Sequence, residues 1–228
     1  MRRPGRRRGK RLDLGVDVRA ARHPSRAAHL GVALLAMAGL ACHYAIVLGH
    51  PDQIAMRSLR FLSFFTILTN ALVAVAAIGF ALPGGRFHGW AVRPATRAAV
   101  TLHILVVALI FHVLLRHMVL PGALGWWGNL LVHQLVPAGW TACWLAFGAH
   151  GRIDRAAPLR WLFFPLGFGG WTLVHGAATG WYPYPFMNVA HLGYPAVLAN
   201  MAVIALVFLA LGYALRWVDG RLSRHAAA

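Results

Sequence analysis

Polar side chains that could do chemistry recur at helical spacing inside otherwise apolar stretches of this chain. Ser63, Thr66 and Asn70 follow each other at i, i+3 and i+7, and Asn129 is one turn from His133. Such intervals place the members of each group on one face of a helix. Polar groups in an apolar span are costly and usually face a cavity or one another. We therefore predict a shared polar layer built from these faces.

Further polar residues join this layer from other apolar stretches. They are His112 and Arg116, one helical turn apart, and then His175, Thr179, Tyr184 and His191. A single Thr or Asn in such a layer ordinarily forms an interhelical hydrogen bond, which stabilises helix association by about 0.6 to 2 kcal/mol. Four His and an Arg gathered in one layer instead favour a functional cavity.

Six apolar spans must position these side chains. Each has about 20 residues, which at 1.5 Å per residue crosses a hydrocarbon core about 30 Å thick. The spans are helical because lipid offers no partner for free backbone groups, and short loops make neighbouring spans antiparallel. The fold class predicted is all-α: a polytopic membrane protein with a compact six-transmembrane-helix bundle. Pro137 is expected to kink the fourth span. The spans are 28–48, 61–82, 98–120, 127–148, 159–178 and 196–216.

Basic residues predict the orientation of the bundle. The chain has 22 Lys and Arg, and only Arg57, Arg60 and Arg116 lie on the side assigned as outer. The other nineteen lie in segments 1–27, 83–97, 149–160 and 216–228. Because loops rich in Lys and Arg stay inside, both termini are predicted in the cytoplasm and the protein in the cell membrane, as a multi-pass protein. The first segment is predicted to be a disordered basic tail and 217–228 a cytoplasmic tail.

The composition excludes an ordinary soluble domain. Hydrophobic residues make up 59% of the chain and charged residues 12%, and the sequence contains no Glu. The net charge of +17 is explained by topology and by attraction of the basic tail to anionic inner-leaflet lipid. No nucleic acid partner is therefore predicted. Cys42 and Cys143 are expected near opposite ends of the bundle, too far apart for a disulfide.

Three segments resemble the androgen-induced membrane protein family. The tract Arg60–Asn70, Arg-Phe-Leu-Ser-Phe-Phe-Thr-Ile-Leu-Thr-Asn, is similar to the family's second span. The order Asn129, His133, Pro137 is similar to its fourth span. The signature before its last span is matched by Val174-His175, Thr179-Gly180-Trp181 and Tyr184-Pro185-Phe186. The resemblance covers about residues 28–216, and bacterial relatives are often labelled integral membrane regulators.

This resemblance implies a membrane-embedded hydrolase. Animal members of the family cleave fatty acid esters of hydroxy fatty acids with a Thr nucleophile and a His. The His position falls on His133, and the Thr position falls on Ser63 in the most direct alignment, with Thr66 one turn further on. Either hydroxyl can attack an ester carbonyl while the imidazole takes its proton. Two departures from the animal pattern are the residue type at Ser63 and a His-to-Pro interval one residue shorter.

The remaining polar residues are predicted to bind membrane lipid or the fatty-acyl ester. Asn129 would orient the ring of His133 or donate to the oxyanion, and Arg116 or His112 would bind a fatty carboxylate. No cofactor and no metal are expected. The predicted substrate-binding residues are Asn70, His112, Arg116, Asn129, His175 and Tyr184.

The segment Gly180–Phe186 carries four aromatic rings, two prolines and no charge. This composition is typical of an interfacial aromatic belt. The segment also leads from His175 to His191, so that it could cover the cavity as a lid.

Other functions stay open from the sequence alone. A non-catalytic lipid-binding or regulatory protein would use the same cavity. Haem or metal binding would use the imidazoles of the layer, which suit zinc, copper and haem iron, although no two of them share a chelating spacing on one helix. Transport is less supported, because neither repeated halves nor discontinuous helices are evident.

Overall fold

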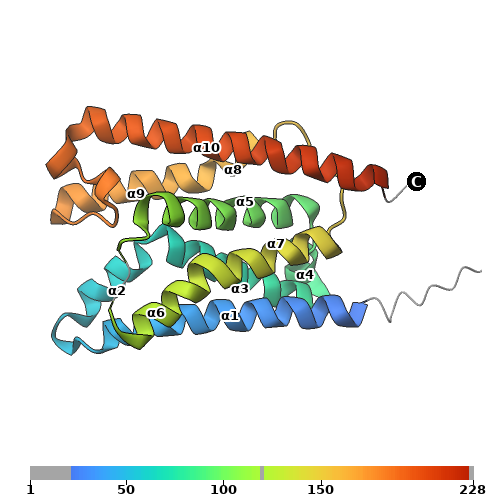
Figure 1. Cartoon of the computed structure of the whole chain (residues 1–228), viewed down its shortest axis with the longest axis horizontal. Helices are drawn as coiled ribbons and strands as arrows, with labels where there is room; N and C mark the ends of the chain where they lie inside the picture. The colour runs from blue at the N-terminus through green and yellow to red at the C-terminus, as the bar shows by residue number, and fades with distance from the viewer. Residues whose placement is uncertain (1–21, 119–120, 226–228) are drawn as a thin grey trace, which may run out of the picture.

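The computed structural model describes residues 22–118 and 121–225, and these residues form helices and connecting loops without a strand (Figure 1). The part of the predicted basic tail before residue 22 lies outside the described residues. The elements are α1 (Arg22–Leu48), η1 (Pro51–Gln53), α2 (Ile54–Leu62), α3 (Phe65–Ala81), α4 (Gly85–Ala91), α5 (Pro94–Ile110), η2 (Phe111–Leu115), α6 (Gly122–Leu130), η3 (Leu131–Leu135), α7 (Val136–Phe147), α8 (Ala157–Trp161), α9 (Phe163–Thr179), η4 (Pro185–Met187) and α10 (Val189–His225).

The long helices α1 and α10 lie along opposite sides of the bundle, with α5 between them (Figure 1). Helix α1 packs against α3, α6 and α7, whereas α10 packs against α5, α8 and α9. The start of α1 and the end of α10 lie at the same end of the bundle, here named the terminal end. Helix α2 lies at the opposite end, here named the cavity end.

Several helices are long and apolar enough to cross a membrane, which suggests a multi-pass integral membrane protein. Four such helices lie within the described residues: Pro24–Leu48, Pro94–Leu115, Gly122–Phe147 and Val189–Arg224. A fifth span results if α2 and α3, which meet at a 73° bend, count as one broken span. Helix α9 overlaps the predicted span 159–178 and is shorter, with 17 residues.

The second predicted span is broken instead of continuous. Helix α2 ends at Leu62, and Phe64 takes an extended conformation (φ −95°, ψ 128°) before α3 begins. The hydroxyl of Ser63 donates to the carbonyl of Leu59 at 2.8 Å, a local bond that competes with helix continuation. The bend removes Ser63 from the predicted common face, whereas Thr66 and Asn70 stay on α3.

Two π-helical segments, η2 and η3, interrupt the helices that form the third and fourth predicted spans. Pro137 lies just after η3, and as a proline it offers no N–H to the carbonyl of His133. The turn that precedes Pro137 is π-helical and therefore wider than an α-helical turn, whereas the kink at Pro137 stays a prediction. Such π-segments often occur at functional sites.

Helix α10 extends beyond the predicted last span in both directions. It includes a kink at Gly193, whose φ of 73° is readily adopted only by glycine, and Pro195 follows within the helix. The helix continues to His225, so most of the predicted tail 217–228 is helical. At the other terminus, α1 begins at Arg22, inside the segment predicted to be a disordered tail.

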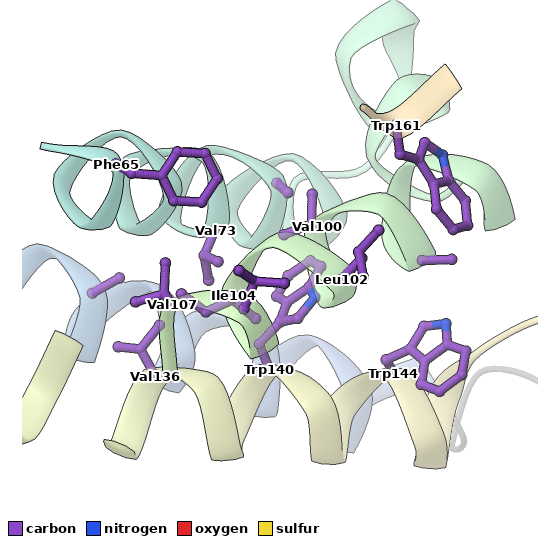
Figure 2. Packing of buried hydrophobic residues seen from close by; sticks show 14 of the residues in the cluster. Phe65, Val73, Val100, Leu102, Ile104, Val107, Val136, Trp140, Trp144 and Trp161 are labelled. Atoms are coloured by element: carbon purple, nitrogen blue, oxygen red, sulfur yellow. The ribbon is translucent and has the colours of Figure 1, made fainter. Parts of the chain in front are cut away.

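The core lies around α5, between α3 and α7. Figure 2 shows Leu102 and Ile104 of α5 between Val73 of α3 and Trp140 of α7, and these four side chains are almost fully buried. The indole of Trp140 donates to the hydroxyl of Thr101 at 3.0 Å. Large apolar side chains also cover the outside of the bundle, as expected for lipid-facing surface.

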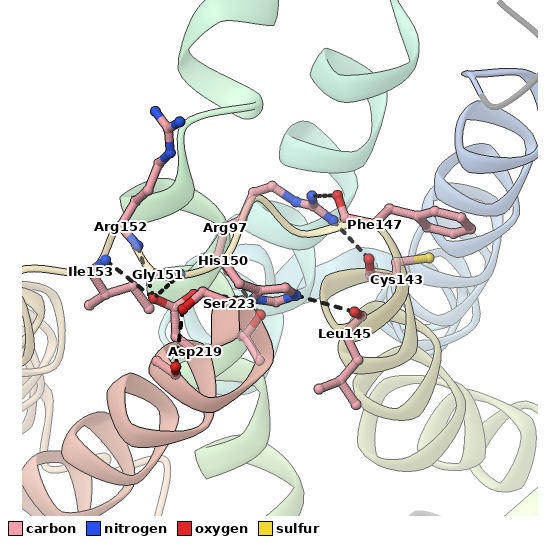
Figure 3. Close-up of polar contacts among 12 residues, drawn as sticks. Arg97, Cys143, Leu145, Phe147, His150, Gly151, Arg152, Ile153, Asp219 and Ser223 are labelled. Carbon is pink, nitrogen blue, oxygen red and sulfur yellow. Dashed lines mark hydrogen bonds and ion pairs between the residues drawn. The ribbon is translucent and has the colours of Figure 1, made fainter. Parts of the chain in front are cut away.

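Polar residues at the terminal end tie helices and loops together (Figure 3). The guanidinium of Arg97 donates to the carbonyls of Phe147 and, at 2.8 Å, of Cys143, both in the last turns of α7. It also contacts the imidazole Nε2 of His29 at 3.2 Å. One carboxylate oxygen of Asp219 accepts three backbone N–H bonds, at 2.9 to 3.3 Å, from residues 151–153.

Candidate functional site

A cavity of about 530 Å³ lies at the cavity end, where α2 crosses the bundle. Aromatic and aliphatic side chains form most of its wall. Its polar lining comes from α1, α2, α3, α6, η3 and the loop after α9. The polar groups are His43, Arg57, Arg60, Thr66, Asn129, His133, Tyr182 and Tyr184.

Thr66 and His133 lie side by side in the lining of this cavity. The hydroxyl Oγ1 of Thr66, in the first turn of α3, lies 3.4 Å from Nε2 of His133, in η3. The ring of Phe111 stacks on the imidazole, with ring centroids 4.0 Å apart, and restricts its orientation. In the tautomer protonated at Nδ1, Nε2 can accept the threonine proton. The pair thus has the arrangement of a hydroxyl nucleophile and its general base.

The phenol of Tyr184 lies next to Thr66. The backbone N–H of Thr66 donates to the phenol oxygen at 3.5 Å, which occupies a donor that the first turn of a helix leaves without an intrahelical partner. Burial raises the pKa of the Tyr184 phenol, so its hydroxyl keeps its proton at neutral pH. That proton is available to an oxyanion formed beside Thr66.

Asn70 joins the two elements that carry Thr66 and His133. Its side-chain NH₂ donates to the carbonyl of Thr66 at 2.8 Å and to the carbonyl of Val132 at 3.2 Å. Asn70 is fully buried and does not line the cavity. It was predicted to bind substrate, and its contacts are those of a residue that positions the Thr66–His133 pair.

Ser63 has a different partner from Thr66. Its hydroxyl lies 3.3 Å from Nδ1 of His175 and accepts from the indole N–H of Trp171 at 3.0 Å. Because the same hydroxyl donates to Leu59, its hydrogen bonds are used inside the protein. Ser63 is buried and is not among the residues that line the cavity. His175, also predicted to bind substrate, faces Ser63 and likewise lies outside the lining.

Two residues predicted to bind a carboxylate lie away from the cavity. His112 and Arg116 are exposed, and neither lines the cavity. The Nδ1 atom of His112 is 2.8 Å from the carbonyl of Ala108, one turn earlier in the same helix. Asn129, predicted to orient His133, does line the cavity.

Sequence reasoning assigned no site role to three cationic or ionisable residues that line the cavity: His43, Arg57 and Arg60. The two Arg lie one turn apart on α2, most of which precedes the predicted span 61–82. The imidazole of His43 packs closely against Gly128, where an added Cβ would lie 2.6 Å from its Nδ1 atom. Glycine at position 128 is therefore the sequence feature that accompanies the placement of His43. The relation between the two residues is visible only in three dimensions.

The aromatic segment after α9 forms part of the cavity wall. Trp181, Tyr182, Pro183 and Tyr184 all line the cavity. A Cβ on Gly176 would lie 2.0 Å from the ring of Tyr182, so glycine is needed for this contact. The segment therefore lines the cavity, and Pro183 and Tyr184 are buried, whereas its role as a lid stays a prediction.

A second, apolar pocket of about 90 Å³ adjoins the cavity. The two share Thr66, Leu115 and Tyr184, and the pocket extends from there between α3, α5, α9 and α10. Phe65, Phe168 and Phe208 are among its lining residues. Thr66 thus stands between a polar space and an apolar one, an arrangement that suits a molecule with a polar group and a hydrocarbon chain.

The predicted histidine layer does not converge on one point. Within the part of the chain that the structure describes, no group of three or more His, Cys, Asp or Glu is placed to hold a metal ion. His133 faces Thr66 and His175 faces Ser63, whereas His191 is exposed. No Asp of the described segments lines the cavity, so the Thr66–His133 pair has no carboxylate partner there.

No protein-family model, no curated protein and no solved structure matches this chain. The resemblance to the androgen-induced membrane protein family therefore stays a prediction.

Proposed function

We propose that this protein is a membrane-embedded esterase that cleaves fatty-acyl esters with Thr66 as nucleophile and His133 as general base. The observation that carries this proposal is the 3.4 Å approach of Thr66 Oγ1 to His133 Nε2 in a cavity that adjoins an apolar pocket. Ser63 is the weaker nucleophile candidate, because its hydroxyl is bonded inside the protein and does not reach the cavity.

In the first step, Thr66 Oγ1 attacks the ester carbonyl while Nε2 of His133 takes the hydroxyl proton. The tetrahedral oxyanion forms next to the Tyr184 hydroxyl, which donates a hydrogen bond to it. The bond to the alcohol oxygen then breaks, and His133 gives its proton to that oxygen. Water, activated by the same imidazole, releases the fatty acid and restores the Thr66 hydroxyl.

The proposed topology is the six-span bundle in the cell membrane with both termini in the cytoplasm. It counts α2–α3 as one broken span and α9 as a short one. The placement of the described termini at one end of the bundle and of the cavity at the other supports it. The site then opens towards the outer leaflet, where lipid esters are available. Membership of the androgen-induced membrane protein family is part of this proposal, because Thr66, His133 and Tyr184 all lie in segments that carry the resemblance.

A second candidate is a lipid-binding protein without catalysis. It is favoured by the environment of Nδ1 of His133, which is buried and has no side-chain hydrogen-bond partner among the described residues. Catalytic imidazoles are usually oriented by a group at this position. The cavity and the pocket would serve lipid binding unchanged.

Labelling with a long-chain fluorophosphonate tests the nucleophile directly. The purified chain in neutral detergent is expected to react, and so is Ser63→Ala, whereas Thr66→Ala and His133→Ala are expected to lose labelling. Asn129→Ala serves as a cavity-lining control that keeps both members of the pair. Labelling of Thr66→Ala at the wild-type rate would contradict the proposed function. A wild-type protein that never reacts but binds lipid would favour the second candidate.

A further inference from the structure

Two guanidinium groups face the cavity from α2. Arg57 and Arg60 are separated by one helical turn, so they project from the same side of that helix. Both are partly buried and line the same cavity as His133 and Asn129. The guanidinium of Arg60 lies over the indole of Trp181, with its carbon 5.3 Å from the ring centroid. This stacking keeps Arg60 in place beside the cavity.

Neither guanidinium has an ion-pair partner in the described segments. The ion pairs found there join Arg160 to Asp154 and His150 to Asp219. Among the described residues, the Nε atoms of Arg57 and Arg60 are buried and make no hydrogen bond, as is also the case for Arg97 and Arg216. Partly burying an unpaired charge is costly, and a planar guanidinium can bond carboxylate or phosphate oxygens in pairs. Two guanidinium groups without an acidic partner in the described segments thus border one cavity, an arrangement that suits an anionic ligand.

The same space offers a place for a hydrocarbon chain. The apolar pocket begins at Thr66 and Tyr184, which also line the cavity, and continues between Phe65, Phe168 and Phe208. A ligand that contacts both regions must carry an anionic group and an apolar chain. A small inorganic anion would leave the apolar pocket empty, and a neutral lipid would leave both guanidinium groups without a partner.

We propose that Arg57 and Arg60 bind the anionic group of a single-chain amphiphile whose acyl chain enters the apolar pocket. The anionic group is a carboxylate or a phosphate monoester, which share this chemistry. This inference rests on the proposed function in one respect, that the preferred esters carry such a group in addition to the scissile bond. The two Arg then select the substrate and set its register relative to Thr66.

Ligand-induced thermal stabilisation of the full chain in a neutral detergent tests this binding without any turnover. Oleate and oleyl phosphate are compared with oleyl alcohol, which has the same chain without the charge. Wild type is expected to reach half-maximal stabilisation at an anionic amphiphile concentration at least about tenfold below that for the alcohol. The more effective of the two anions identifies the group as carboxylate or phosphate.

Matched variants locate the effect. The double variant R57Q/R60Q is expected to lose the preference for the anionic ligands while it still melts cooperatively, and R57K/R60K is expected to retain most of it. R116Q removes the third outer arginine, which lies outside the cavity lining, and is expected to leave the preference unchanged. A preference that persists in R57Q/R60Q, or that R116Q abolishes, overturns the assignment.

Two further measurements distinguish an amphiphile from a small free anion, and failure of this inference from failure of the proposed function. Acetate and inorganic phosphate are expected to give no thermal stabilisation at the same concentrations. Stabilisation by either of them equal to that by oleate or oleyl phosphate would overturn the proposal that the ligand is an amphiphile. Thr66→Ala is expected to keep the charge preference, because Thr66 contributes no charge. If the preference holds but wild type cleaves no ester, the proposed function fails and this inference stands.

Discussion

Two charged residues at the terminal end of the bundle are buried and bonded within the protein, whereas Arg57 and Arg60 at the cavity end are partly buried and line a cavity. At the terminal end, Arg97 bonds the last carbonyls of α7, and Asp219 accepts three backbone N–H groups (Figure 3). At the cavity end, neither the guanidinium of Arg57 nor that of Arg60 has an ion-pair partner or a hydrogen-bond acceptor among the described residues. Buried polar groups are normally paired, so the first arrangement serves folding and the second indicates a ligand site. The sign of a charge therefore does not distinguish a structural residue from a ligand-binding one, whereas its hydrogen-bond and ion-pair partners do.

The largest loss of stability is expected from Asp219→Ala. The change leaves three backbone N–H groups and His150 without their acceptor in a buried position. We expect a loss of about 3 kcal/mol or more in unfolding free energy, measured by thermal unfolding in detergent micelles. Esterase turnover per folded molecule should not change. A variant that is as stable as wild type but loses turnover would reverse the contrast between the two ends.

Gly176→Ala adds only one methyl group, but it is expected to disturb the packing of the cavity end. The new methyl group would overlap the ring of Tyr182, so the aromatic segment must shift. We expect a loss of roughly 1 to 3 kcal/mol in stability, together with weaker binding of oleate. Gly170→Ala is the matched control in the same helix, because nothing lies within 4 Å of its added Cβ. Equal behaviour of the two variants would show that the Tyr182 contact does not matter.

Ser63→Ala separates a structural hydroxyl from a catalytic one. The variant loses hydrogen bonds with Trp171 and Leu59 at the break between α2 and α3. We expect about 1 to 2 kcal/mol of destabilisation and ester turnover within a few-fold of wild type. Thermal unfolding and turnover of a fatty-acyl ester are measured on the same sample. Complete loss of turnover in a stable protein would return the nucleophile role to Ser63.

The smallest effect is expected for Asp154→Ala, which removes an exposed ion pair with Arg160 and an exposed hydrogen bond from the backbone N–H of Ala156. Such pairs contribute little to stability. The hydrogen bond from Arg160 lowers the pKa of Asp154 below its ordinary value of 3.8. Whatever stability the pair adds is therefore present at neutral pH and is lost only as the pH falls below that value. Unfolding curves of variant and wild type at pH 7 should coincide.

Much of the helical architecture and part of the site could be predicted from the sequence. Long apolar stretches indicate membrane helices, and the spacing of Asn129 and His133 places both at the cavity, where Thr66 and Tyr184 also lie. The break at Ser63 could not be predicted, because an apolar stretch gives no sign that a hydroxyl will bond the preceding turn. The number of spans also depends on how that break is counted.

The partners of individual polar residues could not be read from spacing. His112 and Arg116 are one turn apart in the sequence, but they face outwards on a helix whose other side is buried. In the sequence, Arg57 and Arg60 are not distinguishable from ordinary outer-loop charges, whereas in the structure both lie on α2 and line the cavity. Only the bend between α2 and α3 brings them there, and that bend depends on contacts between residues far apart in the chain, such as Ser63 with Trp171.

Hydrolysis of a long-chain fatty-acyl ester in detergent micelles, followed for wild type, Thr66→Ala, His133→Ala and Ser63→Ala, tests the central claim most directly. The Thr66–His133 pair predicts that the first two variants lose at least about a hundredfold in kcat while they remain folded, and that Ser63→Ala keeps turnover. Turnover that survives in both Thr66→Ala and His133→Ala would contradict the esterase mechanism.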